Sequence, residues 1–214
     1  MGKLGPRAKK IRAVSSCVES SDKDCDVFAV FSGVRRLSDK CRKGLPGRPD
    51  TRRNRQTEYS QLMMTKQAIK RYYGVAEKPF KNAYIRASKM RGSAADNLME
   101  ILENRLDNVV YHSGMACTRR EAKQLVSHGH IMVNGKRVNV SSIQIALGDV
   151  ISVTEKAKKH ARIASSLTLA DQRDACSWME VDRTKLTIKI TKSPDLEPLH
   201  ALFKVNRVIE LYSK

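Results

Sequence analysis

The stretch from residue 118 to residue 138, TRREAKQLVSHGHIMVNGKRV, restricts the backbone more than any other part of the chain. Thr118 and Glu121 have the spacing of a capping box, in which two side chains bond backbone N–H groups at a helix start. Gly129 is suited to end that helix because glycine readily adopts positive φ. Asn134 and Gly135 are the favoured pair for a type I′ turn. The stretch therefore predicts a short helix followed by a β-hairpin.

The predicted helix has two unlike faces. At about 100° per residue, one side of the helix carries the apolar residues Ala122, Leu125 and Val126. Arg119, Arg120 and Lys123 fall on the neighbouring side, joined by Ser127. We expect the first face to pack and the second to form a cationic surface, to which the hairpin adds Lys136 and Arg137.

The charge balance indicates what such a surface binds. The chain has 41 Lys and Arg against 22 Asp and Glu, giving a formal net charge of +19. A surplus of this size is usually compensated by a polyanion, because self-repulsion otherwise destabilises the compact state. A membrane is disfavoured, since the longest clean apolar run near the N-terminus, residues 27–31, is far shorter than the roughly 20 residues of a spanning helix. Only 5% of residues are aromatic, which favours folded RNA or a duplex over stacked single-stranded bases.

The cysteines predict a cytoplasmic protein. They are odd in number and scattered, which is not typical of a disulfide framework: Cys17, Cys25, Cys41, Cys117 and Cys176. No apolar segment follows the basic start MGKLGPRAKK, so a secretory signal is not expected. A reducing cytosol is the simplest interpretation.

Residues 1–56 are predicted to form an extended basic arm. Pro46, Gly47 and Pro49 forbid a long helix there. Either the arm is solvated and irregular, or it becomes ordered against phosphates, and the net charge favours the second interpretation. Its candidate RNA contacts are Arg35, Arg36, Arg42, Lys43, Arg48, Arg52, Arg53 and Arg55.

Helical and strand patterns alternate along the rest of the chain. Apolar spacing predicts helices from residue 58 to Gly74, from residue 79 to Gly92, and over residues 96–112. Lys70 and Arg71 lie off the apolar stripe of the first of these helices. WMEV and KLTIKI are predicted to be paired short strands, and HALFKVNRVIELYSK a C-terminal helix. The fold class predicted is α+β.

Two features are compatible with other functions. Cys117, His128 and His130 lie close in sequence with His112 nearby, but zinc-ligand spacing is lacking, so no metal site is expected. Arg105-Leu106-Asp107 matches the R-L-D signature of pseudouridine synthases, in which the aspartate is the nucleophile. The triplet is predicted to lie within a helix and has no activating neighbours, so we expect no catalytic residue and no cofactor.

The segment from RLDNVVY to EKAKK closely resembles the RNA-binding module of the family of protein four of the small ribosomal subunit. The matching pieces include TRREAKQLVSH, IMVNGKRVN and GDVISV. The resemblance continues through IKRYYGV, WMEVD and the terminal ELYSK, and so covers nearly the whole chain. Isolated copies of this module also occur in pseudouridine synthases, tyrosyl-tRNA synthetases and a small heat-shock protein.

The resemblance implies an arrangement of domains. A mostly helical body over residues 57–104 would be completed by residues 166–214, which would pack back on it. A small α/β RNA-binding module, residues 105–165, would be inserted between them, with two helices and β-hairpins. The basic arm, residues 1–56, would precede both.

The resemblance also implies function and partners. Members of the family are structural, bind small-subunit ribosomal RNA early in assembly, contact small-subunit proteins five and three, lie on the path by which mRNA enters, and influence accuracy. Expected RNA contacts outside the arm are Arg105, Arg119, Arg120, Lys123, Gln124, Ser127, His128, Lys136, Arg137, Lys70 and Arg71. The alternatives are an RNA chaperone or ribosome-associated factor that uses the same module, and the RNA-modifying enzyme.

Some residues depart from the family pattern. The family's P-G-Q-H-G loop is here residues 46–50, PGRPD. Of the four N-terminal cysteines that bind zinc in some relatives, only Cys41 falls at a comparable position, while Ala8, Ile11 and Arg36 stand near the others. These changes allow a diverged second copy of the protein.

Overall fold

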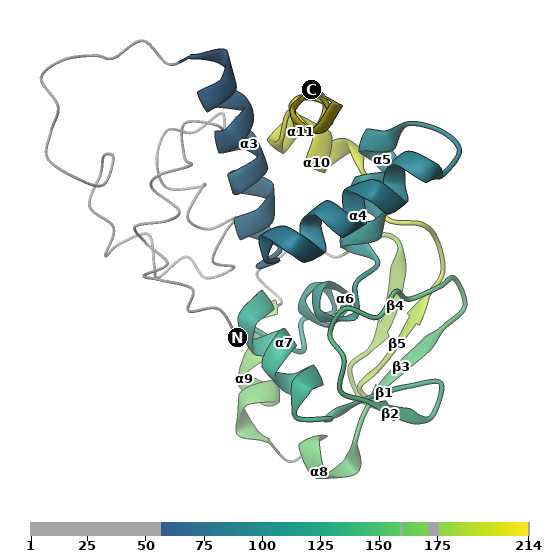
Figure 1. Cartoon of the computed structure of the whole chain (residues 1–214). Helices are drawn as coiled ribbons and strands as arrows, with labels where there is room; N and C mark the ends of the chain where they lie inside the picture. Colours follow the sequence, from purple (N-terminus) through teal and green to yellow (C-terminus); the bar gives the residue numbers. More distant parts are fainter. Residues whose placement is uncertain (1–56, 159, 171–175, 214) are drawn as a thin grey trace, which may run out of the picture. The chain divides into compact units, whose positions relative to one another are not determined.

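The computed structural model describes residues 57–158, 160–170 and 176–213. The chain divides into two compact units, whose helices and strands are labelled in Figure 1. Within the described part, the first unit comprises residues 57–98 and 196–213, and the second comprises residues from 99 to 195.

The first unit is helical. Its helices are α3 (Glu58–Tyr72), α4 (Glu77–Lys89), α5 (Ala94–Glu103, which continues into the second unit), α10 (Glu197–Leu202) and α11 (Asn206–Ser213). Helix α3 packs against α11. The apolar core of this unit includes Leu62, Ile69, Phe80, Phe203 and Val208. Helices close to the C-terminus therefore belong to this unit, but the single helix expected over residues 200–214 is divided into α10 and α11.

Glu77 links α4 to side chains of α3 and α11 in this unit. Its carboxylate accepts hydrogen bonds from Lys66 Nζ at 2.6 Å and from Lys70 Nζ at 2.7 Å. The Tyr212 hydroxyl on α11 also donates to it at 3.2 Å, and the Tyr212 ring stacks on Tyr84. Burial raises the pKa of Glu77, but the hydrogen bonds and charges of the two lysines outweigh burial and lower it to about 2.

The second unit contains an antiparallel sheet with strand order β2-β1-β3-β5-β4. The strands are β1 (Ile131–Val133), β2 (Lys136–Val138), β3 (Val150–Val153), β4 (Met179–Asp182) and β5 (Thr187–Ile190). The helices are α6 (Leu106–His112), α7 (Arg119–Ser127), α8 (Glu155–Lys158) and α9 (Ala161–Ala170). The core combines side chains from α6, α7 and the sheet, among them Leu106, Val109, Ala122, Val126, Ile131, Ile151 and Ile188.

The predicted helix over residues 96–112 is wrong in one respect, because the structure breaks it in two. Arg105 has extended backbone (φ −70, ψ 136) and forms an antiparallel bridge with Gln144. Ile145 N–H donates to the Asn104 carbonyl at 2.9 Å, and Leu106 N–H donates to Ile143 at 3.0 Å. These bonds to a distant loop replace bonds of a continuous helix, so α6 begins at Leu106.

The strands near the C-terminus join a different unit from the one expected. WMEV and KLTIKI do form the pair β4 and β5, as predicted. However, β5 also pairs with β3, with Ile151 opposite Ile188. Residues 176–195 therefore belong to the second unit, whereas the sequence interpretation assigned everything from residue 166 to the body.

The observed architecture confirms the predicted α+β class, with a helical body and a small antiparallel sheet. The predicted basic arm lies outside the described residues. Among the described helices, none combines the length and apolar character needed to cross a lipid bilayer.

Candidate nucleic-acid interface

Helix α7 begins with a capping arrangement close to the predicted one. Thr118 Oγ1 accepts a hydrogen bond from Glu121 N–H at 3.2 Å. Glu121 Oε2 accepts a hydrogen bond from the N–H of Cys117 at 2.9 Å, one residue earlier than in the usual capping box. Both contacts fix the direction in which α7 leaves the preceding loop.

The end of α7 is held by backbone bonds and by Arg137. Gly129 N–H donates to Val126 and His130 N–H donates to Leu125, which is the pattern of a Schellman motif. Gly129 has φ +67, and a Cβ there would collide with the Arg137 guanidinium. Arg137 Nε donates to the Gly129 carbonyl at 2.7 Å, and its Nη2 donates to the His128 carbonyl at 3.0 Å. Arg137 thus ties the hairpin to the helix that precedes it.

The predicted type I′ hairpin is confirmed. Asn134 and Gly135 have φ of 50 and 77, and Val133 pairs with Lys136 across the turn. The Asn134 side chain also donates to Asp149 Oδ1 at 2.8 Å and accepts from the Val150 N–H at 3.0 Å. The asparagine therefore shapes the turn and anchors it to the start of β3.

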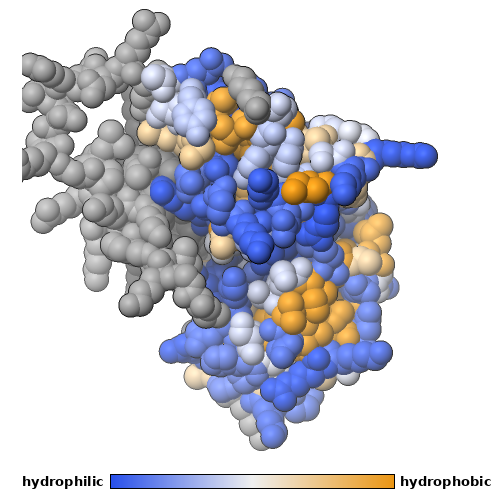
Figure 2. Space-filling view, viewed as in Figure 1, coloured by the Kyte–Doolittle hydropathy of each residue, from blue (hydrophilic) through white to orange (hydrophobic). Residues whose placement is uncertain are grey.

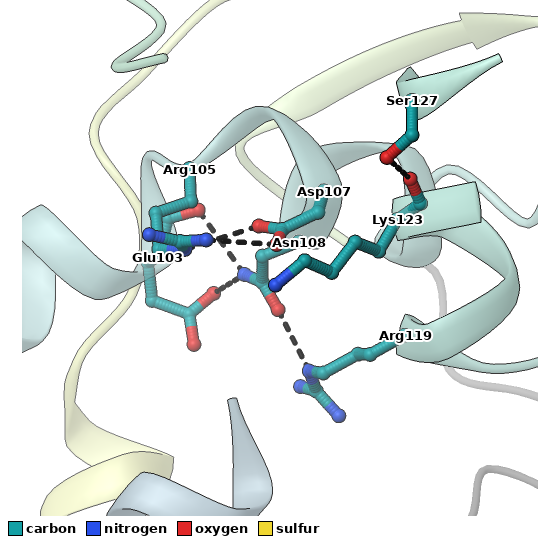
Figure 3. A network of polar contacts seen from close by, with 7 residues as sticks. All are labelled: Glu103, Arg105, Asp107, Asn108, Arg119, Lys123 and Ser127. Atoms are coloured by element: carbon teal, nitrogen blue, oxygen red, sulfur yellow. Dashed lines mark hydrogen bonds and ion pairs between the residues drawn. The ribbon is translucent and has the colours of Figure 1, made fainter. Parts of the chain in front are cut away.

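A buried polar network lies beneath α7 (Figure 3). Arg105 forms a bidentate ion pair with Asp107, with Nε–Oδ1 at 3.1 Å and Nη2–Oδ2 at 2.9 Å. The Asn108 amide donates to Glu103 Oε2 at 2.6 Å and accepts from Arg119 Nε at 2.8 Å. The network therefore connects the end of α5, the start of α6 and the first turn of α7.

Two of the predicted RNA contacts are part of this network. Arg105 is 8% exposed and Arg119 is 9% exposed. The Arg119 guanidinium also lies 4.2 Å from the centre of the Tyr111 ring. The expectation that Arg119 shares a solvent-facing surface with Arg120 and Lys123 is wrong, because its side chain turns inward and joins α7 to α6. Asp107 is buried against Arg105, which is unlike an accessible nucleophile.

The other predicted contacts on α7 and the hairpin reach the surface. Arg120, Gln124, Ser127, His128 and Lys136 are exposed, and Lys123 is half-buried. Ser127 Oγ donates to the Lys123 carbonyl at 2.7 Å and so adds a bond within the last turns of α7. Figure 2 shows hydrophilic residues over much of the visible face of the second unit, interrupted by an apolar area. Arg120 and Lys136 give the exposed part of α7 and the hairpin its positive charge, which suits a phosphate backbone.

Three histidines lie together beside the hairpin. The ring centres of His128 and His130 are 5.9 Å apart, and those of His130 and His160 are 5.1 Å apart. Burial, followed by the positive charges of His160, His128 and Arg137, lowers the pKa of His130. Within the described ranges, no group of three or more His, Cys, Asp or Glu side chains is arranged to hold a metal ion.

The predicted contacts on α3 are in a different environment. Lys70 is engaged by Glu77. Arg71 is half-buried, and burial lowers its pKa. The predicted contacts of the basic arm, residues 35–55, lie outside the described residues.

The structure adds residues that the sequence interpretation did not select. Asn108 has a central position in the buried network, but no spacing rule identifies it, because its partners meet only where α5 ends. Lys156 on α8 and Arg162 on α9 are exposed and are two further cations on the surface of the second unit. The density of basic residues in KAKKHAR was the available signal for them.

Comparison with known proteins identifies the family. Residues 5–103 match the family model described as "Ribosomal protein S4/S9 N-terminal domain", and residues 104–151 match the "S4 domain" model. The small ribosomal subunit protein uS4 of Coxiella burnetii strain RSA 493 / Nine Mile phase I is 50% identical over 212 residues, covering 99% of this chain and 98% of that protein. The uS4 protein of strain CbuG_Q212 is similar to the same extent. These matches confirm the resemblance seen in the sequence, and the chain belongs to the uS4 family of small ribosomal subunit proteins.

Proposed function

We propose that this protein is a structural constituent of the small ribosomal subunit and binds ribosomal RNA through the surface of α7 and the β1–β2 hairpin. The observation that carries the proposal is the set of exposed cationic and polar side chains on these two elements, in a chain of the uS4 family. Family membership also indicates a structural protein with no catalytic step.

Recognition would be electrostatic and geometric. Each Lys or Arg that neutralises a phosphate releases condensed counterions, which favours binding at low salt. The major groove of A-form RNA is too deep and narrow for side chains to read, so contacts fall on phosphates and 2′-hydroxyls. A rigid surface is needed for this, and the Schellman motif, Arg137 and Asn134 hold the helix and hairpin in a fixed relation.

The contacts divide by chemistry. Arg120, Lys123 and Lys136 would bind phosphates. Gln124 and Ser127 carry neutral groups that suit 2′-hydroxyls. Arg105 and Arg119 would act indirectly, by keeping α6 and α7 together beneath that surface.

The salt dependence of RNA binding tests this assignment. Arg120→Ala combined with Lys136→Ala should lower the slope of log affinity against log salt by roughly 1 to 2 units, because each phosphate contact contributes about 0.7 to 0.9. The measurement is filter binding of the full chain to small-subunit ribosomal RNA at several salt concentrations.

A matched control comes from the opposite edge of the sheet. Lys185 and Lys192 are exposed and flank β5, which neighbours the edge strand β4, whereas the hairpin supplies the other edge. Lys185→Ala with Lys192→Ala removes the same charge and should leave the slope nearly unchanged. Equal slopes for the two double variants would remove the α7–hairpin surface from the RNA interface.

The wider role in the subunit follows from the family resemblance. The protein would take part in early assembly, contact small-subunit proteins five and three, and lie near the path of mRNA, with consequences for accuracy. The basic arm, residues 1–56, would add further RNA contacts. Chemical cross-linking of purified small subunits tests the protein contacts, and recovery of no cross-link to protein five or protein three would contradict them.

Sucrose-gradient fractionation tests the role as an integral component. At high salt, the protein should remain with small subunits in a one-to-one ratio. A module-bearing RNA chaperone or ribosome-associated factor would instead move to the soluble fraction.

A further inference from the structure

Three histidines from two separate segments form a cluster beside the β1–β2 hairpin. His128 caps the end of α7, His130 precedes β1, and His160 lies between α8 and α9. The ring centre of His130 lies 5.9 Å from that of His128 and 5.1 Å from that of His160. His128 and His160 are exposed and His130 is half-buried, so a ligand from the solvent can reach the cluster.

Arg137 places a permanent positive charge beside this cluster. Its Nη2 donates to the His128 carbonyl at 3.0 Å, and its Nε donates to the Gly129 carbonyl at 2.7 Å. In the part of the chain that the structure describes, no hydrogen bond of Arg137 uses Nη1, and the side chain is exposed. The Thr154 N–H donates to the His130 carbonyl at 2.9 Å, which fixes the backbone at the centre of the cluster. One guanidinium nitrogen therefore remains for an anion, and the other two hold it in place.

The charged groups around the cluster are mostly basic. Those that act on His130 are the other two histidines and Arg137, and together with burial they lower its pKa. The last turn of α7 carries no charged residue, and the charged side chains of the other neighbouring elements are Lys136 on β2, Glu155, Lys156 and Lys158 on α8, Arg162 on α9, and Asp182, Arg183 and Lys185 at the β4–β5 turn that bonds β3. Glu155 pairs with Lys158 at 2.6 Å, and Asp182 Oδ1 accepts hydrogen bonds within its own turn. Protons on the cluster are therefore opposed by neighbouring cations.

An anion would reverse this balance. A negative charge close to an imidazole favours the protonated form, in which both ring nitrogens donate hydrogen bonds. Each phosphate of an RNA backbone carries one negative charge and oxygen atoms that accept such bonds. His128 ends the helix whose exposed side chains belong to the proposed RNA surface, and Arg137 lies on the hairpin that completes that surface. The cluster therefore continues the RNA surface and is placed to meet the backbone of the same RNA.

We propose that His130 and His160, with His128 and Arg137, form a phosphate-binding site whose contact with ribosomal RNA takes up protons. The site rests on the proposed function, because the phosphate belongs to the RNA that α7 and the hairpin bind. Above the pH range in which histidines ordinarily titrate, Arg137 supplies the charge of the site. As the pH falls, an imidazole that gains a proton beside the phosphate strengthens the contact. The complex then holds more protons than the free protein, so the affinity for RNA rises toward acid pH.

Calorimetry of the unmutated full chain tests the proton uptake without any substitution. The protein is titrated with small-subunit ribosomal RNA at constant ionic strength in two buffers that differ in ionisation enthalpy. The difference between the two observed binding enthalpies gives the number of protons taken up. We expect an uptake of roughly half a proton or more per complex near pH 6 and close to none near pH 8. An uptake of zero near pH 6 would overturn the proposal.

Two variants assign the effect to the cluster. Filter binding in the presence of EDTA compares the affinity at about pH 6 with that at about pH 8. For the unmutated chain the ratio should be roughly threefold to tenfold, because a rise of one pKa unit in one imidazole corresponds to a factor of ten. His130→Gln combined with His160→Gln should bring the ratio close to one. His200→Gln removes an imidazole of the first unit, where Nε2 lies 2.9 Å from Asp96 Oδ1, and should keep the ratio. A folded double variant, as judged by circular dichroism, that keeps the ratio contradicts the proposal.

The salt slope separates this result from the proposed function. Arg120→Ala with Lys136→Ala is measured at about pH 8, where histidines ordinarily carry little charge. A slope lowered by roughly 1 to 2 units, together with a pH ratio of one in the unmutated chain, would leave the α7–hairpin surface in place and overturn the histidine site alone. A slope equal to that of the Lys185→Ala and Lys192→Ala control would overturn both assignments.

Discussion

Arg119 Nε donates a 2.8 Å hydrogen bond to Asn108 Oδ1, and this bond joins the first turn of α7 to α6. Both side chains are buried, so each would be left with an unmet polar group if the other were removed. A cation that the sequence assigns to the surface thus serves to hold two helices together.

We expect Asn108→Ala to lower the free energy of unfolding by about 1–3 kcal/mol, because it leaves buried donors of Arg119 and the carboxylate of Glu103 without this partner. Urea unfolding followed by circular dichroism measures the change. Arg120→Ala, on the exposed side of the same turn, should change stability by less than about 0.5 kcal/mol. Equal effects of the two substitutions would contradict a structural role for the network.

Gly129→Ala should destabilise the second unit for two separable reasons. The residue has φ +67, and the new Cβ would meet the Arg137 guanidinium. Gly148 has φ +85 with nothing near its Cβ position, so Gly148→Ala measures the backbone cost alone, about 1 kcal/mol or more. Gly129→Ala should lower the free energy of unfolding, measured by thermal unfolding, by more than Gly148→Ala does. Adding Arg137→Ala to Gly129→Ala should cost less than the sum of the single changes, since the collision is removed; strict additivity would count against it.

Glu77 should make the first unit sensitive to acid. Its pKa is lowered from 4.5 to about 2 in the folded state, so the folded protein holds the carboxylate ionised more strongly than the unfolded chain does. The resulting stability is present above about pH 4.5 and is lost as the pH falls toward 2. Its size is at most about 1 kcal/mol, because the side chain is 47% exposed and solvent screens the ion pairs. The Glu77→Gln variant should have a lower free energy of unfolding at pH 7 than the unmutated protein. Its free energy of unfolding, measured by urea unfolding at several pH values, should also fall less between pH 4.5 and pH 2.

His130 should give a second pH dependence near neutrality. Burial and the neighbouring positive charges lower its pKa from 6.5, so the unfolded chain binds the proton more readily than the folded one. Stability is therefore full above pH 6.5 and declines as the pH falls below that value. Proton NMR titration of the imidazole should show the lowered pKa directly. In His130→Gln, the decline in unfolding free energy between pH 7 and pH 5 should become smaller, and an unchanged decline would assign it to other groups.

Local signals in the sequence were reliable where neighbouring residues decide the backbone. Helix α7 starts after Thr118 and ends at Gly129, and the hairpin turns at Asn134-Gly135, as the sequence predicted. Each of these features depends on contacts that span only a few residues. The sequence also predicted correctly that β4 and β5 are strands and that they pair with each other. Fold class and family therefore followed from the sequence.

Non-local contacts explain the differences. Helical spacing gives the direction of Arg119 around the helix axis, but it does not reveal that Asn108 lies within reach. The break near Asn104 depends on bonds to residues 143–145, and the assignment of β4 and β5 depends on their pairing with β3. In each case the decisive partner is distant in sequence, so no local pattern carries the information.

The central place of β3 in the sheet has a practical consequence for fragments of this protein. Its two sides are covered by strands from different parts of the chain, β1 before it and β5 after it. An expression fragment that stops at residue 165 would leave the backbone groups along one side of β3 unpaired and open to another molecule, which promotes aggregation. A fragment from residue 99 to residue 195 contains the whole second unit and keeps both sides of β3 covered.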